Sequence, residues 1–125
     1  MIMDKARKKE LQQEYVNTKQ PMGVFIVRCK SNNKCHIQAT PDLKGVMNGT
    51  YVRLLNSRHP NRELQKEWNE LGEESFVIEI LEQLPYDEKD QEKEDYSQEL
   101  ALLQIIWEEK LAGENKVFYM KRMTL

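Results

Sequence analysis

Four side chains of this sequence have the chemistry to bind a transition metal or to act as a nucleophile or base. They are two cysteines and two histidines: Cys29, Cys35, His36 and His59. Structural zinc sites use such ligands in regularly spaced pairs, and the intervals between these four match no common zinc pattern. Two cysteines are also too few for a disulfide framework. The sequence therefore predicts no metal site, and both cysteines are expected to be small buried residues of strands.

The positive charges lie mainly in the first part of the chain. Residues 1–71 hold 13 Lys and Arg against 7 Asp and Glu, whereas residues 72–125 hold 6 against 14. A positive surface attracts anions, so the first part could face nucleic acid and the second part would repel it. A mild excess of this kind is also typical of ordinary solvated surface. The candidate nucleic-acid contacts are Lys34, Arg53, Arg58, Arg62 and Lys66.

A predicted β-hairpin positions the cysteines and His36. Residues 22–29 (MGVFIVRC) are almost continuously apolar, which is typical of a strand buried on both faces. The turn sequence SNNK and the alternating residues 35–39 (CHIQA) predict the returning strand, with Cys29 opposite His36. In that register the two thiols point to opposite faces of the sheet, and His36 shares a face with Phe25.

Helices and one further strand account for most of the remaining chain. Helices are predicted over residues 3–18, 42–56, 61–71 and 100–111, and a strand over residues 75–82. The side chains expected to face inward are Leu43, Val46, Met47, Tyr51, Leu54 and Leu55 in the second helix, Leu64, Trp68 and Leu71 in the third, and Leu100, Leu103, Ile106, Trp107 and Leu111 in the last. The charged run 86–95 is expected to be a solvated loop.

This order of elements predicts a small α+β domain, a three-stranded, mostly antiparallel sheet flanked by helices. We expect a helical N-terminal extension over residues 1–20, the domain over 21–113 and a C-terminal tail over 114–125, in which VFYM could add an edge strand. No run of about 18 apolar residues is present, so no membrane helix is predicted. The basic start lacks the apolar stretch of a secretory signal, so a cytoplasmic location is expected.

Several short motifs of this sequence occur in the order and spacing of a known family. They are GVF at 23–25, HIQ at 36–38, the stretch HPNRELQKEWNELGEESFVIEILEQL at 59–84 and LLQIIWEEKL at 102–111. From Gly23 to about Leu111 the chain resembles the GIY-YIG endonuclease family, and the long stretch at 59–84 is most similar to its phage and bacterial members. The resemblance implies a three-stranded sheet with flanking helices, as the apolar patterns predict independently.

The resemblance also implies which residues would act in an active member. Such members cut DNA phosphodiesters with one divalent metal, using a tyrosine from each tripeptide, an arginine of the first helix and a glutamate of the last. At the matching positions this sequence has Phe25, His36, Val46 and Gln104, and Gln38 replaces the glycine of the second tripeptide. A neutral glutamine does not compensate the charge of Mg²⁺ as a carboxylate does. We therefore expect no intact catalytic or metal site, the four positions being vestigial.

Three functions remain open from the sequence. The first is a non-catalytic binding or regulatory module for nucleic acid or for a protein, with no cofactor. The second is a metal-dependent DNA endonuclease with a rearranged site, in which Mg²⁺ would be held with the help of His36 and either Glu99 or Glu108. The third is a structural or toxin-neutralising protein that acts through its surface, for example as a homodimer.

Overall fold

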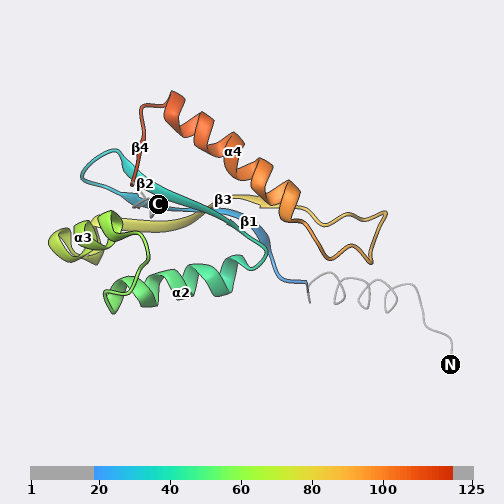
Figure 1. The fold of residues 1–125 in the computed structure, drawn as a ribbon, viewed down its shortest axis with the longest axis horizontal. Coiled ribbons are helices and arrows are strands. Elements are labelled where there is room, and N and C mark those ends of the chain that lie inside the picture. Colours follow the sequence, from blue (N-terminus) through green and yellow to red (C-terminus); the bar gives the residue numbers. More distant parts are fainter. Residues whose placement is uncertain (1–18, 120–125) are drawn as a thin grey trace, which may run out of the picture.

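The computed structural model describes residues 19–119, and Figure 1 shows their arrangement. The helix predicted over 3–18 lies outside the described residues. The described elements are β1 (Met22–Cys29), β2 (Lys34–Thr40), α2 (Leu43–Leu55), α3 (Arg62–Leu71), the 3₁₀ turn η1 (Glu73–Ser75), β3 (Phe76–Leu84), α4 (Ser97–Gly113) and β4 (Val117–Phe118). Within this part of the chain, no helix is long and apolar enough to cross a bilayer.

The sheet has four strands in the order β3-β1-β2-β4, with β1 antiparallel to both of its neighbours. The predicted mixed architecture is confirmed, and the three predicted strands are joined by β4, which pairs parallel to β2. Helices α2 and α3 lie on one face of the sheet and α4 lies on the other (Figure 1). The central strand β1 is therefore covered on both faces, which explains its continuous apolar run.

The hairpin register differs from the predicted one by two residues. Arg28 lies opposite Cys35, because the chain turns through residues 30–33 rather than through a tight turn at Asn32 and Asn33. A shift of two residues leaves every side chain on its predicted face. Cys29 packs in the cluster on the α2 side, whereas Cys35 packs in the cluster on the α4 side, and both thiols are free. The prediction that the two thiols point to opposite faces of the sheet is confirmed.

Four of the side chains predicted to face inward are exposed instead. Tyr51, Leu55, Leu71 and Ile106 have exposed fractions between 39% and 50%. The first three lie on the outer flanks of α2 and α3, beyond the cover that the sheet provides. Ile106 lies on the side of α4 that faces away from the sheet, because a sheet covers only one side of a helix. The sequence LLQII is apolar on more than one side, so periodicity alone misplaced Ile106.

Gly23 lies where the backbones of β1 and β3 approach most closely. A Cβ built on Gly23 would overlap the carbonyl oxygen of Glu82 and would lie 2.8 Å from the Cα of Gln83. The pairing of the two strands shifts between Val24 and Phe25, which marks an irregularity next to this contact. The glycine of GVF is therefore required by the close approach of the two strands, whatever the function of the domain.

Tyr119, the last described residue, is bound to the sheet and to α3. The N–H of Tyr119 donates to the carbonyl of Cys35 (2.9 Å), and the carbonyl of Tyr119 accepts from Nδ2 of Asn61 (3.2 Å). The Tyr119 side chain is 4% exposed and its hydroxyl donates to Glu67 of α3. Burial and the neighbouring Glu67 carboxylate both raise the pKa of Tyr119, so the hydroxyl stays a donor.

Candidate functional site

Three of the four positions matched to the family's catalytic residues lie on the α2 side of the sheet. Phe25 in β1 is fully buried in the core cluster, and Val46 of α2 packs against that cluster. His36 in β2 is on the same face of the sheet, opposite Val27. A phenyl ring and an isopropyl group fill this region, so it offers neither a hydroxyl to orient water nor a guanidinium to bind phosphate.

The fourth position, Gln104, lies on α4. Its Oε1 accepts the N–H of Ala39 in β2 (3.1 Å), and its Nε2 donates to Oε1 of Glu108 (3.1 Å). The amide group therefore satisfies a backbone donor of β2 and also fixes the Glu108 carboxylate. Both ends of the Gln104 side chain thus have structural partners within the domain.

The two carboxylates proposed for a rearranged metal site have other partners. Glu108 accepts from Gln104, and Glu99 pairs with Nζ of Lys93 at 2.7 Å. The hydrogen bond from Lys93 lowers the pKa of Glu99. Among residues 19–119, no three His, Cys, Asp or Glu side chains come close enough together to hold a metal ion. A rearranged metal site built on His36 with either glutamate therefore has no geometric support within these residues.

His36 instead contacts the other histidine of the chain. The rings of His36 and His59 meet edge to face with their centroids 5.3 Å apart, and each residue is 7% exposed. Nδ1 of His59 accepts the N–H of Asn61 (3.0 Å), so the proton of the neutral ring is on Nε2. The sequence does not indicate this pair, because its members are far apart in the chain and no motif joins them.

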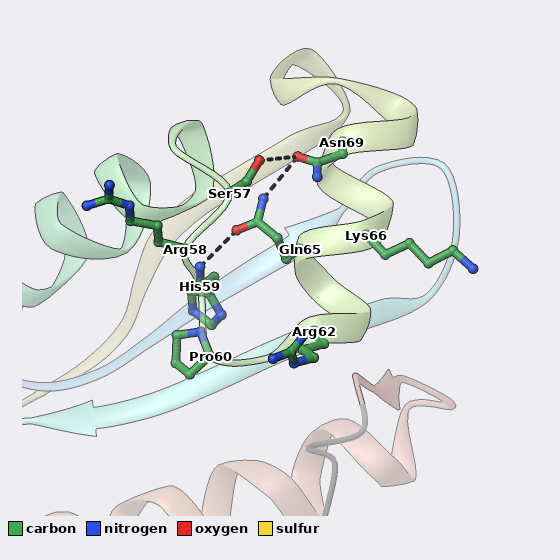
Figure 2. A pocket seen from close by; sticks show the side chains of 8 residues that line it. All are labelled: Ser57, Arg58, His59, Pro60, Arg62, Gln65, Lys66 and Asn69. Atoms are coloured by element: carbon green, nitrogen blue, oxygen red, sulfur yellow. Dashed lines mark hydrogen bonds between the residues drawn. The ribbon is translucent and has the colours of Figure 1, made fainter.

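A basic pocket lies beside His59, between the α2–α3 connection and α3 (Figure 2). It has a volume of about 510 Å³ and is lined by Ser57, Arg58, His59, Pro60, Arg62, Gln65, Lys66 and Asn69. Three of these residues are cationic at neutral pH, and the described residues that line it include no carboxylate. Arg58 and Lys66 extend to opposite sides of the pocket, as Figure 2 shows.

Buried amides hold the wall of the basic pocket in place. Oε1 of Gln65 accepts the N–H of His59 (2.9 Å), and its Nε2 donates to the carbonyl of Leu54 and to Oδ1 of Asn69 (both 3.0 Å). Gln65 is 8% exposed and joins the end of α2, the connection and α3 through these bonds. The wall is therefore set before any ligand binds, which lowers the entropy cost of binding.

The local sequence explains why α3 presents its cations to this pocket. Oδ1 of Asn61 accepts the N–H of Leu64 (3.2 Å) and caps the helix, while Leu64 and Trp68 are buried on its inner side. Arg62 and Lys66 are four residues apart, so they lie one above the other on the same side of α3. The helix predicted over 61–71 is confirmed, with Asn61 as its N-cap and Gly72 as its C-cap.

The structure brings together three of the five candidate nucleic-acid contacts. Arg58, Arg62 and Lys66 line the basic pocket, whereas Lys34 and Arg53 do not. Lys34 forms ion pairs with Glu63 (3.2 Å) and Glu67 (3.5 Å), and the hydrogen bond to Glu63 raises its pKa. Two carboxylates therefore compensate the charge of Lys34. Arg53 is exposed in the last turn of α2.

Comparison with known proteins gives a match in structure. No family model matches the chain. No curated protein sequence matches it either. The catalytic domain of the homing endonuclease I-TevI superposes with a TM-score of 0.60 and 20% identity, over 79% of this chain and 98% of that domain. A mutant catalytic domain of the intron endonuclease I-TevI gives a TM-score of 0.60 and 19% identity, over 85% and 100% of the two chains.

That domain is a GIY-YIG endonuclease domain. This chain has a GIY-YIG-like fold. The match covers 98% to 100% of the compared domains, so the whole GIY-YIG-like architecture is present and not a fragment of it. Identities of 19% and 20% establish the fold alone. The resemblance seen from GVF to the last helix is thereby confirmed at the level of the fold, and the GIY-YIG-like scaffold carries the basic pocket on its α2–α3 side.

Proposed function

We propose that this GIY-YIG-like domain binds nucleic acid without cleaving it, and that the basic pocket contacts the phosphate backbone. The observation that carries the proposal is that Arg58, Arg62 and Lys66 all line one preformed pocket whose described lining includes no carboxylate. Phosphates are the anions that such a cluster of cations and amides fits best. The fold supports the same ligand, because the compared domains belong to endonucleases.

The neutral side chains of the pocket suit a phosphate as well as the cations do. Arginine binds phosphate oxygens through its planar fork, and lysine acts as a point charge. The side chains of Ser57 and Asn69 add polar groups at the same wall, joined by a hydrogen bond of 3.5 Å. None of these groups reads a base edge by itself, so we expect the pocket to contribute affinity and position rather than sequence specificity.

The side chains at the vestigial positions support binding without cleavage. Phe25 and Val46 fill the α2 side of the sheet with apolar atoms, and both ends of the Gln104 amide have partners. Phosphodiester cleavage with a metal requires a carboxylate to hold the ion and a base to prepare water. These three residues supply neither group.

The salt dependence of binding tests the proposed ligand. A fluorescein-labelled DNA duplex of about 20 base pairs should bind with a log K that falls linearly with log salt. Three phosphate contacts predict a slope of about −2.7, because each contact contributes about −0.9 on duplex DNA. Fluorescence anisotropy between about 0.05 and 0.2 M salt measures that slope. Absent binding, or affinity that does not change with salt, would contradict the proposal.

A second candidate, cleavage at a rearranged site, rests on the His36–His59 pair, because a histidine pair can supply a general base and a general acid. We expect no nicking of supercoiled plasmid by the purified protein with either Mg²⁺ or Mn²⁺, since none of the four vestigial positions carries a carboxylate to hold the ion. The His36→Ala variant is assayed in parallel. Metal-dependent nicking that disappears in this variant would overturn the non-catalytic proposal and make His36 the centre of a nuclease.

A further inference from the structure

The outer face of α4 carries apolar side chains that no described element covers. Leu102, Ile105 and Ile106 are 59%, 50% and 50% exposed, although each is a large aliphatic residue. Helix α4 lies on one face of the sheet, and no other described helix or strand lies beyond it (Figure 1). Contiguous apolar surface on a folded domain is typical of a site that binds a partner.

The spacing of residues on this outer face fits packing against another helix. Residues 98, 102, 105, 109 and 112 follow one another at intervals of four, three, four and three, and all five are exposed. We call these five residues the α4 stripe. Such intervals are the heptad spacing of helices that pack side by side. The buried residues of α4 lie on the opposite side of the helix, so the stripe is available to a second helix.

We propose that the α4 stripe binds the α4 stripe of a second copy of this chain, with the two helices antiparallel. A symmetric dimer requires a surface that is complementary to itself across a two-fold axis. With the axis beside the middle of α4, Leu102 of each copy faces Ile105 of the other, and Gln98 faces Glu109. This inference goes beyond the proposed function and does not rest on it, because the basic pocket lies on the other face of the sheet.

The order of residues along the α4 stripe supplies the required self-complementarity. Leu102 and Ile105 form its centre, so the two-fold axis places apolar side chains against apolar side chains. Gln98 lies four residues before Leu102, and Glu109 lies four residues after Ile105, so both polar ends are equally far from the centre. The amide of Gln98 can donate a hydrogen bond to the Glu109 carboxylate of the second copy. An apolar centre with a polar rim is the usual composition of an interface.

Charge favours the antiparallel arrangement over the parallel one. A parallel pair would place the two Glu109 carboxylates opposite each other, and such like charges repel. In the antiparallel pair each Glu109 lies near the first turn of the other α4, where the helix dipole favours a negative charge. Among the described residues, the N-cap residue Tyr96 gives that turn no side-chain hydrogen bond. The carboxylate of the first turn, Glu99, is already paired with Lys93.

The mass of the full chain in solution tests the dimer. One helix from each copy buries less than the roughly 800 Å² per partner of a standard interface, so we expect a weak dimer. With a Kd of about 0.1 mM or below, the average mass should rise from 14.9 kDa toward twice that value between about 0.01 and 0.5 mM protein. Sedimentation equilibrium measures this change. A monomeric mass throughout this range would overturn the proposal, and the face would then belong to a different protein.

Ile105→Asp places a charge at the centre of the α4 stripe, and we expect it to raise the Kd of the dimer by about tenfold or more. Leu55→Asp is the matched control, because Leu55 is also 50% exposed but lies on α2, at the other face of the sheet. The Kd of this control should equal that of the unaltered chain. An equal rise in both variants would show that the copies associate through some other surface.

Cysteine cross-linking tests the orientation of the two helices. In the antiparallel pair Gln98 faces Glu109, whereas the two Gln98 positions are about 16 Å apart along the axis, beyond the reach of a disulfide. We therefore expect a mixture of the Gln98→Cys and Glu109→Cys variants to form a disulfide-linked dimer with the oxidant diamide, and neither variant to do so alone. The natural thiols, Cys29 and Cys35, are buried and do not interfere. Cross-linking of each variant alone would indicate parallel helices and overturn the proposal.

Discussion

Replacing Arg58, Arg62 and Lys66 together with glutamine should weaken binding of the labelled duplex on the order of 100-fold near 0.15 M salt. The three side chains line one pocket, and each phosphate contact of this kind contributes about 1 kcal/mol. A loss of about 3 kcal/mol corresponds to roughly a 150-fold change in Kd. The slope of log K against log salt should also become shallower by about 2.7, the contribution of three phosphate contacts. Anisotropy titrations of the variant and the unaltered chain measure both changes.

A control variant separates the basic pocket from the net charge of the protein. Lys44, Lys89 and Lys110 are exposed and do not line the pocket, so their replacement by glutamine removes the same three charges elsewhere. We expect this control to change affinity less than threefold. An equal loss in both triple variants would show that binding follows net charge alone, and the assignment of the pocket would then be wrong.

Replacing Gly23 with alanine should lower the free energy of unfolding by about 3 kcal/mol. The new Cβ would overlap the Glu82 carbonyl oxygen and crowd the Cα of Gln83, both of which are backbone atoms that cannot rotate away. Either β3 moves, which weakens its pairing with the central strand, or the clash remains, and both are costly in a packed sheet. Urea unfolding followed by circular dichroism measures the change.

Gly49→Ala is the matched control for the stability measurement. Gly49 lies within α2, and a Cβ built there meets no atom within 4 Å. Alanine is about 1 kcal/mol more favourable than glycine inside a helix, so this variant should be equally stable or more stable. If Gly23→Ala changed stability by less than 0.5 kcal/mol, the two strands would have more room than their backbone geometry indicates.

Local sequence patterns predicted helices and strands well where one structural feature causes both the pattern of residues and the contacts that these residues make. The continuous apolar run of β1 follows from its cover on both faces, and the cap at Asn61 follows from a hydrogen bond three residues away. The burial of the apolar side chains of α2 was predicted less well, because Tyr51 and Leu55 are apolar but exposed beyond the edge of the sheet. Periodicity reports which residues are apolar, whereas burial depends on how far the neighbouring layer extends.

The candidate site depended more on contacts between distant parts of the chain. The sequence identified Arg58, Arg62 and Lys66 as candidates, but only the fold shows that Gln65 joins the walls around them. The fold also pairs Lys34 with two glutamates of α3. Counting charges along the chain does not reveal these ion pairs. Side chains that meet only through tertiary structure leave no fixed spacing in the sequence, so no motif signals them.

The pairing of β4 with β2 has a consequence for the order in which the domain folds. Lys34 lies beside Val117, so almost the whole described domain forms the loop between the two paired strands. The β1–β2 hairpin closes over a few residues, whereas β4 joins only after that long loop has been closed at an entropic cost. With two residues in the strand, β4 gains few hydrogen bonds in return. β4 is therefore the strand expected to join the sheet last and to leave it first. The edge of the sheet at β2 then opens before the interior of the sheet does.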